Sequence, residues 1–536
     1  MMLEARRPGL YVERTPAPPV LAPLRSDIAA FAGRARRGPV GVPVRIEGWR
    51  EFERVFGGLG TATHLSYAVR GYFENGGQVA YVLRVGRVAD ADDRALPRPF
   101  VCARRSIMLG AITVNVFAAS PGAWANRARV VFSLKRAGVG VPRLAIRVET
   151  DDEPDEFIGP IKLDARALAE EPGDSELDPL VRAITNRSDR IRVETTLKDM
   201  QTRAAQQPRT DWDVELGGGV DGEAAQPLYL DALTALCDQV EPALLAFPDL
   251  GLDIAGDQER ADILREAILR CEELKDRMVL TEMPADGDEF RHPPLDFDAT
   301  VQWSHALRNE DLPGGARSAA FYHPWLRVSD PLGGVVTPLR DVPPCGHVAG
   351  IVSRSDRERG ASYTPANLPV YDAVDLSRSF AEPVEIEFNR LGINMIRCAP
   401  GSGLMVWGGG TLARSSTADE RENRFVAHRR LINRLVRAIR RVAEPLVFDN
   451  NGPELWLTIY RGVNSVLFEA FQHGALKGSR PEEAYQIRCD ATLNTPDVID
   501  LGQVLCEIEV APAAPMEYIL LRLSFGGDGR LEVFES

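Results

Sequence analysis

The sequence lacks the segments that would place it in or across a membrane. Its 536 residues include no run of about 18 apolar residues, the length that a membrane-spanning helix needs. The start, MMLEARRPGLYVERTP, has no apolar core of a signal peptide, which predicts synthesis in the cytoplasm. A net charge of -14 and a pI near 5.2 argue against general nucleic-acid binding, because phosphate backbones favour basic surfaces.

The signatures of catalysis and of metal or nucleotide binding are also missing. The seven cysteines are scattered without a C-x-x-C pair, and the seven histidines show neither H-E-x-x-H nor i, i+4 pairing. No G-x-S-x-G elbow occurs. The glycine-rich LGGGVDGEAA at 216–225 lacks the Lys-Ser/Thr pair of a phosphate loop. We therefore assign no catalytic, cofactor or metal-binding residue, and we interpret the cysteines as reduced core residues.

What the sequence does contain is alternating strand and helix patterns over a length that requires several domains. IAAFAG at 28–33 and VAYVLRV at 79–85 are typical of buried strands, with helical patterns between them. Short alternating segments between about 90 and 195 favour a β-rich insertion, and the α/β pattern then returns. The predicted fold class is a multidomain mixture of α/β and α+β: an inner α+β domain with extended terminal arms, a middle α/β domain and an inserted β-rich domain.

Two weaker patterns could belong to an enzyme. Asp249 and Glu282 follow predicted strands, where open α/β sheets place ligands and catalytic groups. Cys345 and His347, in PPCGHVAG at 343–350, would point the same way on a strand, an arrangement that a thiol nucleophile could exploit. Polar residues also cap strand ends, and isolated Cys-x-His pairs arise by chance. A structural role is therefore the favoured interpretation of both patterns.

A basic helix near 420–442 stands out in this acidic chain. Phe425, Ile432, Val436 and Ile439 share one predicted face. Four arginines at i, i+4, i+7 and i+11 share the opposite face: Arg430, Arg434, Arg437 and Arg441. This stripe favours an anionic partner surface, with an internal salt-bridge network or plain solvation as the alternatives.

Both ends of the chain are rich in strand-forming residues. The prolines of residues 1–25 forbid helix, and GLYV within them could add a strand to the edge of another sheet. YILLRLSF and LEVF form predicted strands near the other end. The candidates for strand exchange between subunits are Leu10, Tyr11, Val12, Ile519, Leu520, Leu521 and Leu523.

An ordered series of segments resembles the contractile tail sheath family, which forms the outer sleeve of contractile phage tails, pyocin-like particles and related injection systems. The series begins with PGLYVER, AAFAGRARRGP, EFERVFGG and SPGAWANRARV. It continues with LGGGVDG, FYHPWLRV, VPPCGHVAGIVSRSDRERGASYTPAN, LGINMIR and GLMVWGGGTL. It ends with NRFVAHRRL, VFDNNGPELWLTIYRGVNSVL, GALKGSRPEEAYQIRCD and APAAPMEYILLRLSF. One departure is that Trp407-Gly408-Gly409-Gly410-Thr411 replaces the Trp-Gly-x-Arg-Thr of many sheaths, so a contact by that arginine is not expected.

The resemblance implies a domain layout. It comprises an N-terminal arm, a middle α/β domain in two pieces, an inserted outer domain, a tube-facing inner domain and C-terminal strands. Their expected ranges are 1–25, 26–89 with 196–410, 90–195, 411–517 and 518–536. On this basis PPCGHVAG is a structural loop of the middle domain, whose prolines fix the backbone and whose Gly346 and Gly350 permit tight turns.

The resemblance also implies a function: a non-enzymatic subunit that forms stacked, usually sixfold, rings around an inner tube and contracts to drive the tube through a target envelope. The implied partners are further copies of the chain, the inner tube protein, and baseplate and tail-terminator proteins, with no nucleic acid, membrane insertion or cofactor. The particle would be a virion tail or an injection device, inside the cell or released. The arginine stripe is the candidate tube contact. An α/β hydrolase-like enzyme and another self-assembling tail protein remain the alternatives.

Overall fold

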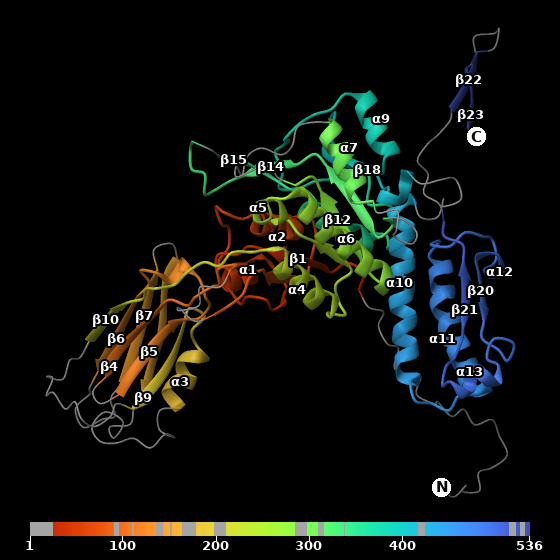
Figure 1. The fold of residues 1–536 in the computed structure, drawn as a ribbon. Helices are drawn as coiled ribbons and strands as arrows, with labels where there is room; N and C mark the ends of the chain where they lie inside the picture. Colours follow the sequence, from red (N-terminus) through yellow and green to blue (C-terminus); the bar gives the residue numbers. More distant parts are fainter. Residues whose placement is uncertain are drawn as a thin grey trace, which may run out of the picture. The chain divides into compact units, whose positions relative to one another are not determined.

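The computed structural model describes residues 25–89, 96–109, 112–135, 143–150, 153–162, 178–197, 211–284, 297–308, 316–336, 338–415, 424–513, 521–525 and 531–535. These residues form a mixed α/β structure with several sheets, as the sequence predicts (Figure 1). Contacts divide the chain into a larger unit, which includes Arg25–Asn433 and Pro512–Ser536, and a smaller unit, which includes Arg434–Ala511. Each unit is described separately below.

A nine-stranded sheet organises the larger unit, in the order β16-β19-β18-β13-β12-β11-β1-β3-β2. The six strands from β18 to β3 are parallel, and the outer strands β2, β19 and β16 pair antiparallel. The strands are β1 (Ala29–Gly33), β2 (Val44–Ile46), β3 (Ala80–Arg84), β11 (Leu244–Ala246), β12 (Met278–Glu282), β13 (Ala319–His323), β16 (Leu368–Pro369), β18 (Ile393–Ala399) and β19 (Gly403–Trp407). The predicted strands IAAFAG and VAYVLRV are confirmed as β1 and β3, two neighbouring central strands.

Helices cover both faces of this sheet, which explains why its central strands are buried along almost their whole length rather than on alternate residues. One apolar core includes residues of α4 (Gln226–Cys237), α6 (Asp257–Leu274), α7 (Phe297–Ala306) and α9 (Glu382–Arg390), and α5 (Leu250–Asp253) adds Leu250 to it. The core on the other face includes residues of α1 (Trp49–Phe56), α2 (Leu65–Glu74) and α8 (Cys345–Glu358). A small sheet of β14 (Leu326–Ser329), β15 (Leu339–Val342) and β17 (Asp375–Leu376) also contributes to this second core.

The region between β3 and α4 holds two antiparallel sheets that share one apolar core. The four-stranded sheet has the order β10-β6-β7-β8 and the three-stranded sheet the order β4-β5-β9. The elements are β4 (Arg104–Leu109), β5 (Ile112–Ala118), β6 (Arg129–Lys135), β7 (Arg143–Thr150), β8 (Glu153–Lys162), α3 (Asp178–Thr185), β9 (Ile191–Leu197) and β10 (Asp211–Glu215). The short alternating strands predicted here are present, and β6 buries every second residue.

Two glycine-containing segments of the family resemblance meet at this insertion. The Asn126 side-chain amide donates to Gly219 O at 2.8 Å, and its Oδ1 accepts from Gly219 N at 2.8 Å. A Cβ atom on Gly219 would stand 2.3 Å from Gly122 O, so only glycine fits there. SPGAWANRARV and LGGGVDG are thus two sides of one contact, and the glycine-rich segment serves backbone packing.

The described residues of the smaller unit form a long helix, several short helical turns and a two-stranded sheet. Its elements are α11 (Pro453–Gln472), α12 (Pro481–Ala484), β20 (Tyr485–Arg488), α13 (Pro496–Asp500) and β21 (Glu507–Val510). Helix α10 (Val426–Ala443) begins in the larger unit and ends in the smaller one. The closing strands predicted from the sequence are confirmed as β22 (Leu521–Phe525) and β23 (Leu531–Glu535), which pair antiparallel.

Candidate functional site

Asp249, one of the two strand-end carboxylates, anchors the start of α2. It lies just after β11, is 0% exposed, and accepts hydrogen bonds from Arg34 N at 2.7 Å, Thr63 Oγ1 at 2.9 Å and the backbone N–H groups of His64 and Leu65. Burial, with a smaller contribution from the charge of Asp253, raises the pKa of Asp249 to about 6, although these hydrogen bonds favour the ionised form. Its acceptor capacity is used to cap α2 and to hold the end of β1.

Glu282 ends β12 and contacts the Cys345 thiol, which donates a hydrogen bond to its carboxyl group. Burial raises the pKa of Glu282 to about 8 and that of Cys345 well above its ordinary value. At neutral pH both groups therefore hold their protons, whereas a nucleophilic site needs a thiolate and a free base. The pair fills space between the sheet and α8.

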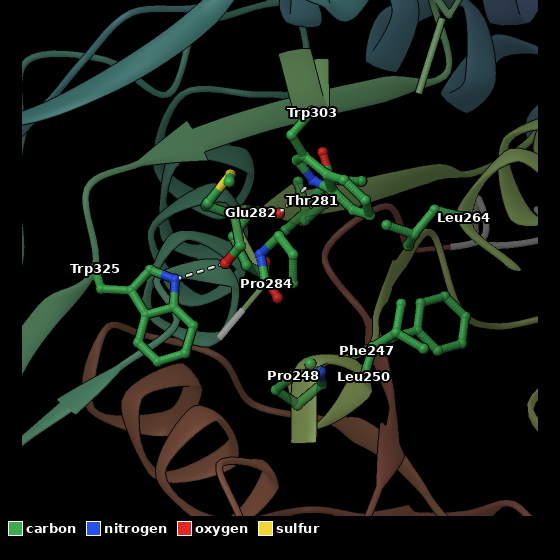
Figure 2. Close-up of a pocket in the computed structure, with 12 residues that line it drawn as sticks. Phe247, Pro248, Leu250, Leu264, Thr281, Glu282, Pro284, Trp303 and Trp325 are labelled. Atoms are coloured by element: carbon green, nitrogen blue, oxygen red, sulfur yellow. Dashed lines mark hydrogen bonds between the residues drawn. The ribbon is translucent and has the colours of Figure 1, made fainter. Parts of the chain in front are cut away.

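A small cavity lies beside Glu282 at the end of β12 (Figure 2). Trp303 and Trp325 lie to either side of the chain at Glu282 and Pro284 in this view. Their indole N–H groups donate to the carbonyl oxygens of Glu282, at 3.1 Å, and Met283, at 2.8 Å. The cavity volume is about 20 Å³, room for roughly one water molecule. The end of β12 is therefore closely packed against the two indole side chains.

PPCGHVAG is not the loop that the sequence predicted. Pro344 precedes α8, and Cys345 through Gly350 form its first two turns in a buried position. The glycines allow a close helix crossing rather than tight turns: a Cβ on Gly346 would stand 2.2 Å from Ala68 O of α2. A Cβ on Gly350 would stand 2.4 Å from Tyr72 O of the same helix.

His347 belongs to the same crossing. Its ring occupies the space left by Gly71 of α2, where a Cβ would stand 2.4 Å from the imidazole. Burial lowers the pKa of His347 to about 4, so the ring is neutral at physiological pH. Together with the protonated Cys345 thiol, this shows that the Cys-x-His pattern serves packing between α2 and α8.

A wider groove, of about 1210 Å³, lies where the ends of β1 and β3 meet the β insertion. Its basic side chains have partners. Arg34 forms an ion pair with Asp253, and Arg84 donates to Gly38 O and Pro121 O while it stacks 4.1 Å from the centroid of Phe100. The Arg84 contacts to Pro121 and Phe100 hold the insertion against the end of β3, and the Arg34–Asp253 pair lies within the α/β part. Among the described residues no cluster of His, Cys, Asp or Glu could hold a metal ion, and no helix is long and apolar enough to cross a membrane.

The four arginines of α10 lie in different environments. Arg430 is 3% exposed and forms an ion pair with Asp356 of α8, so the salt-bridge alternative applies to this residue. Arg437 is also buried, at 1% exposed. Arg434 and Arg441 are partly exposed and are the members of the stripe that a partner can reach. Spacing along one helix could not reveal Asp356, which is 74 residues away on another helix.

The strand-exchange candidates are only partly covered by the structure. Leu521 and Leu523 lie in β22, opposite Glu535 and Val533 of β23. The remaining candidates lie outside the described residues: Leu10, Tyr11, Val12, Ile519 and Leu520.

An exposed apolar stripe on α11 was not singled out from the sequence. Leu457, Tyr460 and Phe468 are 40–47% exposed and recur at i, i+3 and i+11, which places them on one side of the helix. The signal was available in LWLTIYRGVNSVLFEAF, which carries more apolar residues than one buried face requires. Such a stripe is typical of a surface that contacts another protein.

Solved structures of contractile sheaths share this fold over almost the whole chain. The helical sheath of the anti-feeding prophage (AFP) in its contracted state has 20% sequence identity and a TM-score of 0.54, covering 96% of this chain and 98% of that one. The sheath complex of PVC, an extracellular contractile injection system, in its contracted state has 18% sequence identity and a TM-score of 0.55, covering 99% of this chain and 100% of that one. A sheath tail protein of Listeria innocua has 12% sequence identity and a TM-score of 0.59, covering 90% of this chain and 94% of that one.

These similarities show that the chain has the contractile tail sheath fold, although no protein-family model and no curated protein matches its sequence.

Proposed function

We propose that the chain is the structural subunit of a contractile tail sheath. It polymerises as stacked rings of six around an inner tube and contracts to drive the tube through a target envelope. The observation that supports this function is the shared fold, which extends over at least 90% of this chain and includes two sheaths in contracted states. The enzyme alternative is disfavoured because the strand-end carboxylates and the Cys345 thiol are packed or occupied by hydrogen bonds.

Contraction on this proposal is a rearrangement of rigid subunits that needs no nucleotide. The extended array is assembled in a metastable state, and the contracted array buries more surface between subunits. Packed interfaces favour discrete arrangements, so the change occurs as a switch rather than a gradual deformation. The nine-stranded sheet with helices on both faces suits a body that rotates without deforming.

We assign the link between neighbouring subunits to strand exchange by the terminal arms. The arm around Leu10, Tyr11 and Val12 and the strand at 519–523 add to a sheet of a neighbour, so that their hydrogen bonds persist while the bodies rotate. The acceptor that fits best is the sheet of β20 and β21. Helix α11 packs against β20, where the Tyr485 hydroxyl donates to Asn464 Oδ1 at 3.0 Å. Among the described residues the sheet has two strands, so each has an outer edge whose backbone groups a further strand can bond.

We assign the tube contact to the accessible part of the basic stripe, Arg434 and Arg441. Charge pairs at a surface contribute up to about 1 kcal/mol each and are screened by salt, which suits a contact that must guide assembly and later release. The apolar stripe of Leu457, Tyr460 and Phe468 is assigned to contacts between protein subunits. Baseplate and tail-terminator proteins bind the two ends of the array.

Electron microscopy of the full chain produced with its tube partner tests the main proposal. We expect striated tubular sleeves around a central tube, and shorter, wider sleeves after contraction. Particles that stay monomeric under all assembly conditions with the tube present would refute it. Deletion of residues 1–20 tests the arms separately: we expect a folded protein, with an unchanged circular dichroism spectrum, that forms no sleeves. Normal sleeves from this truncation would remove the N-terminal arm from the mechanism.

A further inference from the structure

Two cysteines in the smaller unit face each other across the β20–β21 sheet. Four residue pairs define its antiparallel register, from Tyr485 opposite Val510 to Arg488 opposite Glu507. The next step of the same register places Cys489, which follows β20, opposite Cys506, which precedes β21. The two cysteines are far apart in sequence, but the segment between them connects the two paired strands and so brings them together.

The position of this pair in the hydrogen-bond pattern is the one that brings side chains closest. Ala511 N donates to Ala484 O at 2.9 Å, which marks that opposite pair as hydrogen-bonded. Hydrogen-bonded and non-hydrogen-bonded pairs alternate along an antiparallel ladder, so the cysteine pair, five steps further on, is of the non-hydrogen-bonded kind. Such pairs have Cα atoms about 4.5 Å apart, within the roughly 4.4–6.8 Å that disulfides span.

Contacts on both sides of the pair hold the two strands in place. On the strand side, Arg488 forms an ion pair with Glu507. On the loop side, Asn494 is 2% exposed and bridges the next two opposite residues. Its Nδ2 donates to Asp490 O at 3.1 Å and to Leu505 O at 3.0 Å, and its Oδ1 accepts from Leu505 N at 2.7 Å. The cysteines are therefore held opposite each other before any bond forms.

The two thiols are in contact and partly accessible, so the interpretation of the cysteines as core residues is wrong for this pair, as it is for the exposed Cys398. A side-chain hydrogen bond joins them, and both residues are of intermediate exposure. Burial raises both pKa values, that of Cys506 to about 12, while the mutual hydrogen bond lowers the pKa of Cys489. Cys489 is therefore the thiol that ionises first, with Cys506 as its hydrogen-bond donor.

We propose that Cys489 and Cys506 are a redox modification site that closes to an intramolecular disulfide on exchange with a small-molecule disulfide such as oxidised glutathione. The Cys489 thiolate attacks one sulfur of the reagent, forms a mixed disulfide and releases one glutathione thiolate. Cys506 then loses its proton and attacks the Cys489 sulfur, which releases the second glutathione thiolate. The protein gives up two electrons and two protons, and the reagent is reduced to two thiols.

The bond covalently closes the loop 490–505 at the open end of the β20–β21 sheet. It restricts the unfolded chain and fixes the register of this small sheet. The inference rests on the register and the contacts around the pair, so it holds whether or not the sheet accepts strands from a neighbour. In a reducing cytoplasm the pair stays as thiols, and it closes when the protein meets an oxidising environment.

Peptide mapping of the full chain tests the proposal. The purified protein is treated with oxidised glutathione, free thiols are alkylated, and the denatured chain is digested with trypsin. Cys489 and Cys506 lie in one expected peptide, because no lysine or arginine occurs between Arg488 and Arg522. We expect this peptide to be unalkylated and about 2 Da lighter than its reduced form. A second cleavage by a protease specific for acidic residues should leave its two halves joined until a reductant is added.

The dependence on pH and on variants completes the test. Because the Cys489 pKa is raised, the rate of closure should increase about tenfold per pH unit from 7 to 8. Cys489→Ser and Cys506→Ser should each abolish the lighter peptide, and Cys398→Ser, at an exposed cysteine, should leave it unchanged. Glutathione adducts that never resolve, linkage between two chains, or a peptide that remains fully alkylated in the wild-type protein would each overturn the proposal. The wild-type map decides the question even where a variant fails to fold.

Discussion

Replacement of Gly346 by alanine separates helix propensity from helix packing. In an average helix, Gly→Ala stabilises by about 1 kcal/mol. At Gly346 the added Cβ would stand 2.2 Å from O, 2.4 Å from Cα and 2.5 Å from C of Ala68, all backbone atoms of α2. Neither helix can absorb this by a change of rotamer, so α2 and α8 must separate by roughly 1 Å, which costs a quarter to a half of the dispersion energy across the gap.

Overpacking a core costs about 1–3 kcal/mol, and the loss of contacts along the separated helices adds to it. After the propensity gain is subtracted, we expect Gly346→Ala to lower the free energy of unfolding by roughly 2–4 kcal/mol. With an unfolding entropy of about 2.1 cal/mol/K per residue over the larger unit, Arg25–Asn433 and Pro512–Ser536, each kcal/mol lowers the apparent Tm by about 1 °C, so the Tm should fall by about 2–5 °C. Thermal unfolding followed by circular dichroism measures this change.

The control is Gly217→Ala, because a Cβ there meets nothing within 4 Å and the backbone is outside the left-handed region. Its effect should stay within about 0.5 kcal/mol. Gly350→Ala, which would place a Cβ 2.4 Å from Tyr72 O, should behave like Gly346→Ala. A Gly346→Ala protein that melts at or above the wild-type temperature would refute the packing explanation.

Three further predictions concern charge. The pKa of Asp249 is about 6 in the folded state but 3.8 in the unfolded chain, so the folded state binds more protons between these pH values. The free energy of unfolding should therefore rise as the pH falls from about 6 to 4. Urea unfolding of Asp249→Asn should lack this pH-dependent rise. Asp356→Ala should lower the free energy of unfolding by about 3–5 kcal/mol, because it leaves Arg430 buried without its ion-pair partner. The double variant Asp356→Leu with Arg430→Met should recover much of this stability. Additive losses in the double variant would contradict the explanation. Glutamate at both Arg434 and Arg441 should weaken tube-templated assembly most at low salt, as sedimentation with the tube protein can measure; unchanged binding would exclude these residues.

The sequence predicted elements whose signal is local. The apolar runs at 28–33 and 79–85 are buried strands because a parallel sheet under two layers of helices needs such runs. Asp249 and Glu282 do stand at strand ends, as predicted. Their roles could not be predicted, because the partners Thr63 and Cys345 come from distant segments that only the topology brings together.

Errors arose where tertiary contacts reverse a local preference. Gly346 and Gly350 favour turns by their intrinsic propensity, yet both lie within α8. Glycine is required at these two positions because the backbone of α2 passes too close for any side chain. The ion pair between Arg430 and Asp356 could not be predicted for a related reason. Helical spacing indicates which residues share a face of the helix but not which element packs against that face. The same limit hid Cys489 and Cys506, whose proximity depends on the register of β20 and β21.

The two units differ in how their sheets are completed, and this difference fits the division of labour proposed above. In the larger unit the nine-stranded sheet has helices on both faces, and its edges are short strands of two and three residues. Short edge strands discourage pairing with other chains, so this sheet is finished within one subunit. The sheet of β20 and β21 has two strands among the described residues, and its outward residues are exposed. On the proposed function, the body that rotates without unfolding would use the first kind of sheet, and the joint that stays attached during rotation would use the second, because added strands provide backbone hydrogen bonds that do not depend on how the bodies pack.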